Sequence, residues 1–159
     1  MPATQGRLAV RQVRTDSPEA TRALAAALAS AALPGDLIAL HGDLGAGKTQ
    51  FAKGFGAGLG VTATINSPSY VLMAEYEGRL PLFHLDLYRL EDARDAFAGG
   101  LIDERQASGV SLVEWAERLG PALPGERLDV ELAGSGDEPR TIRLTAIGPG
   151  LERYLAAIP

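Results

Sequence analysis

The sequence predicts an α/β fold in which a mainly parallel sheet is flanked by helices and carries antiparallel strands at its edge. Apolar strand patterns alternate with helical patterns in the first half of the chain, which is typical of a parallel sheet. Two pairs of strand patterns with turn signals between them add antiparallel hairpins. The 159 residues are 46% hydrophobic and 22% charged, an ordinary composition for a globular protein. We expect residues 1–159 to form a single domain.

The first half of the chain predicts two strands and two helices. Leu8 to Val13 has the pattern of a short strand, and Pro18 to Ala32 that of a buried helix. Ser17 is a good N-cap for this helix, and proline suits the first helical position. The apolar run Leu37 to Leu40 suits a buried parallel strand. A glycine-rich turn then leads into a helix expected over Lys48 to Leu59.

The second half predicts shorter elements. Alternating apolar residues on either side of turn signals indicate two hairpins, one joining Tyr70 to Glu77 with Leu80 to Leu87 and one joining Leu128 to Ala133 with Thr141 to Ile147. A further buried strand is expected over Val110 to Val113. Helices are expected over Glu91 to Phe97, Leu101 to Gln106 and Leu151 to Ala157.

The composition excludes several classes of function. The formal net charge is -5, whereas a protein that binds bare nucleic acid by itself usually carries a basic face, so we expect no DNA partner. The absence of cysteine excludes disulfides, thiolate catalysis and cysteine-type zinc sites. The longest apolar stretch, Ala23 to Leu33, is too rich in alanine for a spanning helix or a signal peptide. We expect a cytoplasmic protein without membrane attachment.

A phosphate-binding motif follows the strand at Leu37 to Leu40. Residues 42–49 read GDLGAGKT and match the P-loop pattern G-x-x-x-x-G-K-[ST], with a strand before it and a helix after it. Backbone N–H groups and the helix dipole bind phosphate in such a loop. The nucleotide-binding residues are therefore expected to be Gly42, Asp43, Leu44, Gly45, Ala46, Gly47, Lys48 and Thr49. The alternative is a chance glycine-rich turn.

Within this motif, two side chains have the chemistry for specific roles. Lys48 is expected to reach the β- and γ-phosphates and to act in catalysis, and the hydroxyl of Thr49 is expected to bind Mg²⁺. No N-K-x-D motif for guanine is present, so ATP is favoured over GTP. A small P-loop kinase acting on a metabolite, and a module that senses nucleotide without turnover, are the alternatives to an ATPase.

A P-loop site also needs a carboxylate at the end of a neighbouring strand to hold Mg²⁺ or its water. Asp86 in PLFHLDLYR and Glu114 in VSLVEW are the candidates, as metal ligands and as catalytic residues. For both, the alternative is a solvated carboxylate at a strand end. His84 lies on the same strand face as Asp86 and either orients it or is only structural. Arg89 either stabilises transition-state charge or forms a surface ion pair.

Four sequence blocks, in this order and spacing, resemble the TsaE family, whose older name is YjeE. They read GDLGAGKT at 42–49, SPSY at 67–70, HLDLYRL at 84–90 and VEWAER at 113–118. The resemblance runs from about Leu8 to beyond Arg118. The family comprises bacterial P-loop ATPases needed to make threonylcarbamoyladenosine in tRNAs that read codons beginning with adenine. The resemblance thus implies a hydrolase with ATP and Mg²⁺ as cofactors.

The resemblance also implies roles for particular residues. It places Asp86 and Glu114 on the metal side of the site and Trp115 close to the nucleotide, although a sole tryptophan at a strand end is as often a core residue. The segment with Ser67 and Ser69 resembles the family's switch-like loop, in which threonine usually stands in place of Ser69. Gln50 stands where the family often has a second threonine after GKT.

Partners are likewise implied by the resemblance alone. Proteins of this family dock on a complex of TsaD and TsaB, which binds tRNA and transfers the threonylcarbamoyl group. The ATPase is thought to reset that complex between turnovers and to hydrolyse ATP only weakly by itself. The acidic charge of this chain fits an indirect link to tRNA, because the partners would bind most of the RNA.

Overall fold

A computed structural model describes residues 8–43, 45–66, 73–92, 94 and 103–159. Their strands are β1 (Leu8–Thr15), β2 (Leu37–His41), β3 (Met73–Tyr76), β4 (Leu82–Asp86), β5 (Val110–Glu114), β6 (Arg127–Ala133) and β7 (Arg140–Ile147). Their α-helices are α1 (Pro18–Ala29), α2 (Lys48–Gly58) and α4 (Glu152–Ala156). Two 3₁₀ helices, η2 (Glu104–Ser108) and η3 (Ala116–Ala122), complete the described elements.

The described strands form one mixed sheet in the order β1-β7-β6-β2-β5-β4-β3. Its centre is parallel, because β2 pairs in parallel with β5 and with β6, and β5 pairs in parallel with β4. The hairpins β3–β4 and β6–β7 are antiparallel, and β1 pairs antiparallel with β7 at the edge. This confirms the predicted α/β fold with a parallel core and antiparallel strands outside it.

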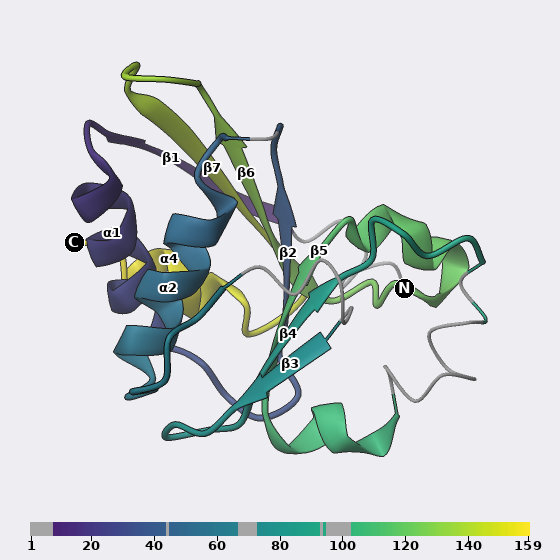
Figure 1. Ribbon diagram of the computed structural model, residues 1–159. Coiled ribbons are helices and arrows are strands. Elements are labelled where there is room, and N and C mark those ends of the chain that lie inside the picture. Colours follow the sequence, from purple (N-terminus) through teal and green to yellow (C-terminus); the bar gives the residue numbers. More distant parts are fainter. Residues whose placement is uncertain (1–7, 44, 67–72, 93, 95–102) are drawn as a thin grey trace.

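The two faces of the sheet are covered differently. Figure 1 shows α1, α2 and α4 together on one face, where they enclose the larger hydrophobic cluster around Phe51, Phe55 and Tyr154. On the other face a smaller cluster contains Phe83 and Leu119 and is covered partly by η3. None of the helices in the described ranges has the length and the apolar run needed to cross a bilayer.

Helices α1 and α2 approach closely because α2 carries glycine where it crosses α1. A Cβ added to Gly54 would lie 2.2 Å from the carbonyl oxygen of Arg22, and one added to Gly58 would lie 2.5 Å from that of Ala26. These two glycines are four residues apart, so they share one helix face. The close approach brings α2 over the sheet, and the first residue of α2 is Lys48.

The start of β2 is fixed by the C-terminal helix. The hydroxyl of Tyr154 donates to Asp36 Oδ2 at 2.5 Å, and the guanidinium of Arg153 donates to the same oxygen. Tyr154 is fully buried, and burial together with the bond to Asp36 raises its pKa. Because Asp36 directly precedes β2, these bonds hold the strand that leads into the glycine-rich loop.

Several element boundaries differ from the predicted ones. Helix α1 ends at Ala29 rather than Ala32, since the hydroxyl of Ser30 donates back to a carbonyl of the last turn. The helix expected from Glu91 is wrong at its first two residues, which are not helical, and the Asp92 carboxylate accepts from the backbone N–H of Arg94. Arg94 is helical as expected, whereas residues 93 and 95–97 of that range, like 70–72 of the first hairpin, lie outside the described residues.

Two 3₁₀ helices account for the remaining differences. The helix expected over Leu101 to Gln106 is in its described part a 3₁₀ helix that begins after Asp103, whose side chain and that of Gln106 form a capping box. Helix η3 was not predicted. It begins immediately after Trp115, the only non-glycine residue with positive φ among the described residues, and a sequence pattern gives no signal for such a reversal.

We predict that Gly54→Ala destabilises the fold. Helix propensity alone would favour alanine by up to about 1 kcal/mol. The clash with the Arg22 backbone should outweigh this and lower the free energy of unfolding by about 1–3 kcal/mol. Urea unfolding of the variant beside the wild type measures the sign, and an unchanged or higher free energy of unfolding would show that α1 and α2 can separate without cost.

Candidate functional site

The candidate site lies where the parallel strands end. Leu40 of β2 pairs in register with Glu114 of β5, and Glu114 pairs with Asp86 of β4. Parallel strands present their carboxyl ends at one edge of a sheet, and this is where ligands bind in open α/β folds. The register therefore places the two predicted carboxylates side by side, next to the loop that leaves β2.

The loop from Gly42 to Lys48 depends on glycine at several positions. The φ values of Gly42, Gly45 and Gly47 are 152°, 83° and 107°, a region that favours glycine. A Cβ on Gly42 would also lie 2.6 Å from the carbonyl oxygen of Leu132 in β6. Gly47 caps α2, and its carbonyl accepts from the N–H of Phe51 at 2.9 Å. The N–H groups of the first turn of α2 have no acceptor within the helix, and such groups are what a phosphate site at a helix N-terminus uses.

Glu114 links this loop to the strands. Its Oε1 lies 3.8 Å from Nζ of Lys48, and its Oε2 accepts from Nε2 of His84 at 2.8 Å. His84 is fully buried, and its Nδ1 has no hydrogen-bond partner among the described residues, which favours the tautomer with the proton on Nε2. The interpretation that His84 orients Asp86 is therefore wrong, since the histidine reaches across to the next strand and binds Glu114.

The alternative that Asp86 and Glu114 are solvated strand-end charges is also wrong. Their exposed fractions are only 6% and 5%. Asp86 Oδ1 accepts from the N–H of Tyr88 at 3.0 Å, which turns the chain after β4. Two adjacent buried carboxylates, with Thr49 lining the same cavity, supply oxygen ligands of the kind that Mg²⁺ takes alongside water and phosphate. The residues present thus fit the expected metal.

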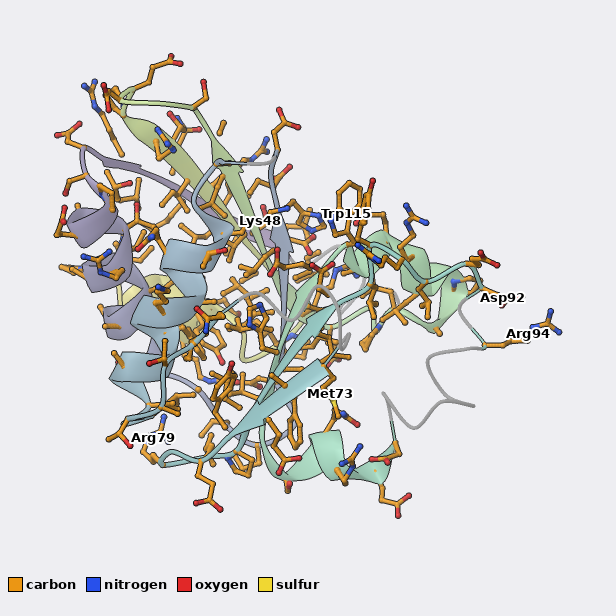
Figure 2. All side chains as sticks on the ribbon, viewed as in Figure 1. Lys48, Met73, Arg79, Asp92, Arg94 and Trp115 are labelled. Carbon is orange, nitrogen blue, oxygen red and sulfur yellow. The ribbon has the colours of Figure 1, made fainter. Side chains whose placement is uncertain are left out.

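Trp115 is partly exposed and lies beside Lys48. The Lys48 ammonium is 5.4 Å from the centre of the indole ring, and Figure 2 labels the two residues close to each other. The ring also packs against Tyr88, with centroids 4.9 Å apart, and the Arg118 guanidinium lies over both rings. Trp115 touches the smaller hydrophobic cluster but is not one of its buried residues. The structure therefore places it at the loop rather than in the core.

A cavity of about 830 Å³ joins these parts, and it is large enough for a small-molecule ligand. Its wall contains most of the predicted site residues together with Gln50, Tyr88 and Arg89, namely Gly42, Asp43, Gly45, Gly47, Lys48, Thr49, Asp86, Glu114 and Trp115. Ala46 belongs to the loop, but it is buried and does not line the cavity. Leu44, Ser67 and Ser69 lie outside the described residues. A smaller, mainly apolar cavity of about 320 Å³ on the other face contains none of the site residues.

Sequence reasoning did not assign Tyr88 or Arg118 to the site. The only signal was their place in the blocks HLDLYRL and VEWAER, close to Asp86 and Glu114. Their contact with Trp115 depends on how the two strands are paired, which a single sequence does not reveal. Arg89 is exposed on the cavity wall, a position compatible with contact to a bound phosphate.

His41, at the end of β2 beside the site, has a pKa above the ordinary value for histidine. Its Nε2 lies 3.3 Å from Asp129 and its Nδ1 3.8 Å from Glu117 in η3. The hydrogen bond to Asp129 and the charges of Asp129, Glu117 and Glu131 raise the pKa of His41 despite its partial burial. Burial pushes the pKa of Asp129 upward, but bonds from His41 and Arg127 outweigh burial and lower it.

The arrangement of loop, helix and carboxylates defines an α/β protein with a P-loop-like fold. The family model "Threonylcarbamoyl adenosine biosynthesis protein TsaE" matches residues 15–142. The chain therefore belongs to the TsaE family, proteins of tRNA threonylcarbamoyladenosine biosynthesis, which confirms the resemblance of the four sequence blocks.

Individual relatives agree with this assignment. The chain is 48% identical over 136 residues to the TsaE protein of Bacillus subtilis, covering 85% of each chain. It is 41% identical to that of Treponema pallidum, covering 68% of this chain and 80% of the relative. The crystal structure of YdiB from Bacillus subtilis superposes with a TM-score of 0.79 at 38% identity, over 96% of this chain and 95% of the other.

We predict a pH-dependent contribution of His41 to stability. A pKa raised above the ordinary value of 6.5 means that the contribution is complete below pH 6.5 and is lost as the pH rises through the higher folded-state value. The free energy of unfolding should therefore fall over this interval in the wild type and fall less in His41→Gln. Denaturant titrations across this pH range measure the difference, and parallel curves would show that His41 has the same pKa in both states.

Proposed function

We propose that this protein is a cytoplasmic P-loop ATPase that binds and hydrolyses ATP with Mg²⁺ and serves the TsaB–TsaD complex in tRNA threonylcarbamoyladenosine synthesis. The observation that carries the proposal is the convergence of three features in one cavity. These are the glycine-rich loop, the Lys48 ammonium, and the buried carboxylates of Asp86 and Glu114. The name of the family supports the pathway.

The charges of the cavity favour a nucleotide accompanied by a divalent cation. The wall carries three carboxylates, on Asp43, Asp86 and Glu114, and two basic side chains, on Lys48 and Arg89. Such a wall does not neutralise a polyphosphate by itself. Mg²⁺, when bound, would neutralise charge that develops on the phosphoryl oxygens. Thr49, Asp86 and Glu114 are the residues proposed to hold it or its water.

The chain's own residues would bind and orient the phosphates. The α2 amide groups and Lys48 supply donors on one side of the cavity, and Glu114 holds Lys48 there at 3.8 Å. His84 fixes the carboxylate of Glu114 by a hydrogen bond at 2.8 Å. This fixed set of charges is the kind of arrangement that stabilises a transition state without reorganisation.

The decisive experiment compares ATP hydrolysis by the protein alone and with the TsaB–TsaD pair. The proposal expects slow turnover alone and a clear rise with both partners present. A rise that depends instead on a small-molecule acceptor would overturn it in favour of a kinase. Nucleotide binding without any turnover, even with the partners, would overturn it in favour of a nucleotide sensor.

We predict that Asp86→Asn and Glu114→Gln lower Mg²⁺-dependent hydrolysis about 10²–10³-fold while nucleotide still binds in the absence of metal, since such groups act mainly where charge develops. Single-turnover hydrolysis and calorimetry measure the two quantities. Glu131→Gln, an exposed carboxylate on β6, is the control and should behave as the wild type. Normal hydrolysis by both site variants with the partners present would remove these acids from the mechanism.

We predict that MgADP or MgATP changes the fluorescence of Trp115, the only tryptophan of the chain. The indole ring lies 5.4 Å from the Lys48 ammonium, so phosphate bound at Lys48 alters its surroundings. Lys48→Ala should lose the response, whereas Lys53→Ala, the other lysine of the chain, should keep it. A flat titration, with binding verified by calorimetry, would place the nucleotide away from Trp115.

A further inference from the structure

Arg140, the first residue of β7, reaches the glycine-rich loop from the side opposite Glu114. Its Nε donates to the carbonyl oxygen of Ala46 at 3.1 Å, and its Nη2 donates to that of Gly45 at 3.2 Å. The same guanidinium donates to the backbone carbonyl oxygen of Gly136 at 3.1 Å and to that of Glu138, both in the turn of its own hairpin. Figure 1 shows this β6–β7 hairpin beside the end of the sheet from which α2 starts.

These bonds fix the direction of a loop amide. In a trans peptide the carbonyl and the following N–H point in opposite directions. With the Ala46 carbonyl held toward Arg140, the N–H of Gly47 is directed away from the hairpin, toward the cavity whose wall contains Gly47 and Lys48. The N–H of Ala46 forms a hydrogen bond within the loop, since it donates to the backbone carbonyl oxygen of Asp43 at 3.0 Å.

The backbone of the hairpin leaves room for this side chain. Gly134 has a φ of 124°, and a Cβ there would lie 2.9 Å from Cδ of Arg140 and 2.6 Å from the carbonyl oxygen of Pro139. On the loop side, Gly42 lies directly against the carbonyl of Leu132 at the end of β6. Loop and hairpin thus pack backbone to backbone, with the guanidinium of Arg140 bonded to both.

We propose that Arg140 is a positioning residue that holds the glycine-rich loop in the conformation that binds a nucleotide polyphosphate. The proposal rests on the proposed nucleotide function. Arg140 does not line the cavity, and its guanidinium donates to four carbonyl oxygens, so it acts by geometry rather than as a phosphate ligand. A loop that must order itself on binding would lose affinity, since preorganisation is what lowers that cost.

The fork shape of the side chain provides the test. Lysine keeps the charge but has a single nitrogen with three N–H donors in place of the planar guanidinium, so it cannot reproduce the four hydrogen bonds that Arg140 makes to the loop and the hairpin turn. Arg140→Lys and Arg140→Ala should therefore each weaken ADP binding, and raise the KM for ATP, about tenfold, with little change in kcat. The loss of ADP affinity should be equal at low and high salt, because Arg140 acts by geometry rather than by its charge. Arg143→Ala, an exposed arginine on the same strand, should match the wild type.

Calorimetry with MgADP on wild type, Lys48→Ala and the three arginine variants separates the outcomes. Binding by the wild type that is lost in Lys48→Ala supports the nucleotide site itself. If Arg140→Lys then binds ADP like the wild type, the positioning role is overturned while the nucleotide function stands. If the wild type does not bind ADP, both are overturned. Thermal unfolding of each variant verifies folding, and should Arg140→Ala fail to fold, Arg140→Lys alone decides.

Discussion

The carboxylate of Glu114 is the group on which the candidate site depends. It is 5% exposed, and an isolated carboxylate buried to that extent would be strongly unfavourable. The N–H of His84 and the ammonium of Lys48 offset this cost from two different elements, β4 and α2. Removing one partner of such a buried group generally costs more than the pair contributes, because the other charge stays buried. The positions of β4, β5 and the loop are therefore coupled through one side chain.

The loop itself is held from both flanks. On one side Lys48 is paired with Glu114, and on the other Arg140 donates to two loop carbonyls. Between them, Gly42 approaches Leu132 so closely that a side chain would collide with the β6 backbone. The short P-loop motif thus depends for its shape on residues that lie almost one hundred positions away in the sequence.

The sequence could predict the features that depend on neighbouring residues, but not the contacts between residues far apart in the chain. Asp86 and Glu114 were found from local patterns, because each ends an apolar strand, and the parallel register then brings them together. The partner of His84 could not be found, since strand spacing shows which face a residue occupies but not which neighbour lies across from it. Arg140 and the reversal at Trp115 had no local signal at all, one being a contact between distant segments and the other a single backbone dihedral angle.

The mixed topology explains why an arginine of β7 can serve a loop after β2. Strand β6 runs parallel to β2, so it ends at the same edge of the sheet as the loop. Strand β7 is antiparallel to β6 and therefore begins at that edge, where Arg140 is its first residue. An antiparallel strand beside a parallel core thus brings its amino end to the functional edge, whereas a further parallel strand would bring only its carboxyl end. The β6–β7 hairpin therefore supports the loop from the side of β6, while Glu114 supports it from the side of β5.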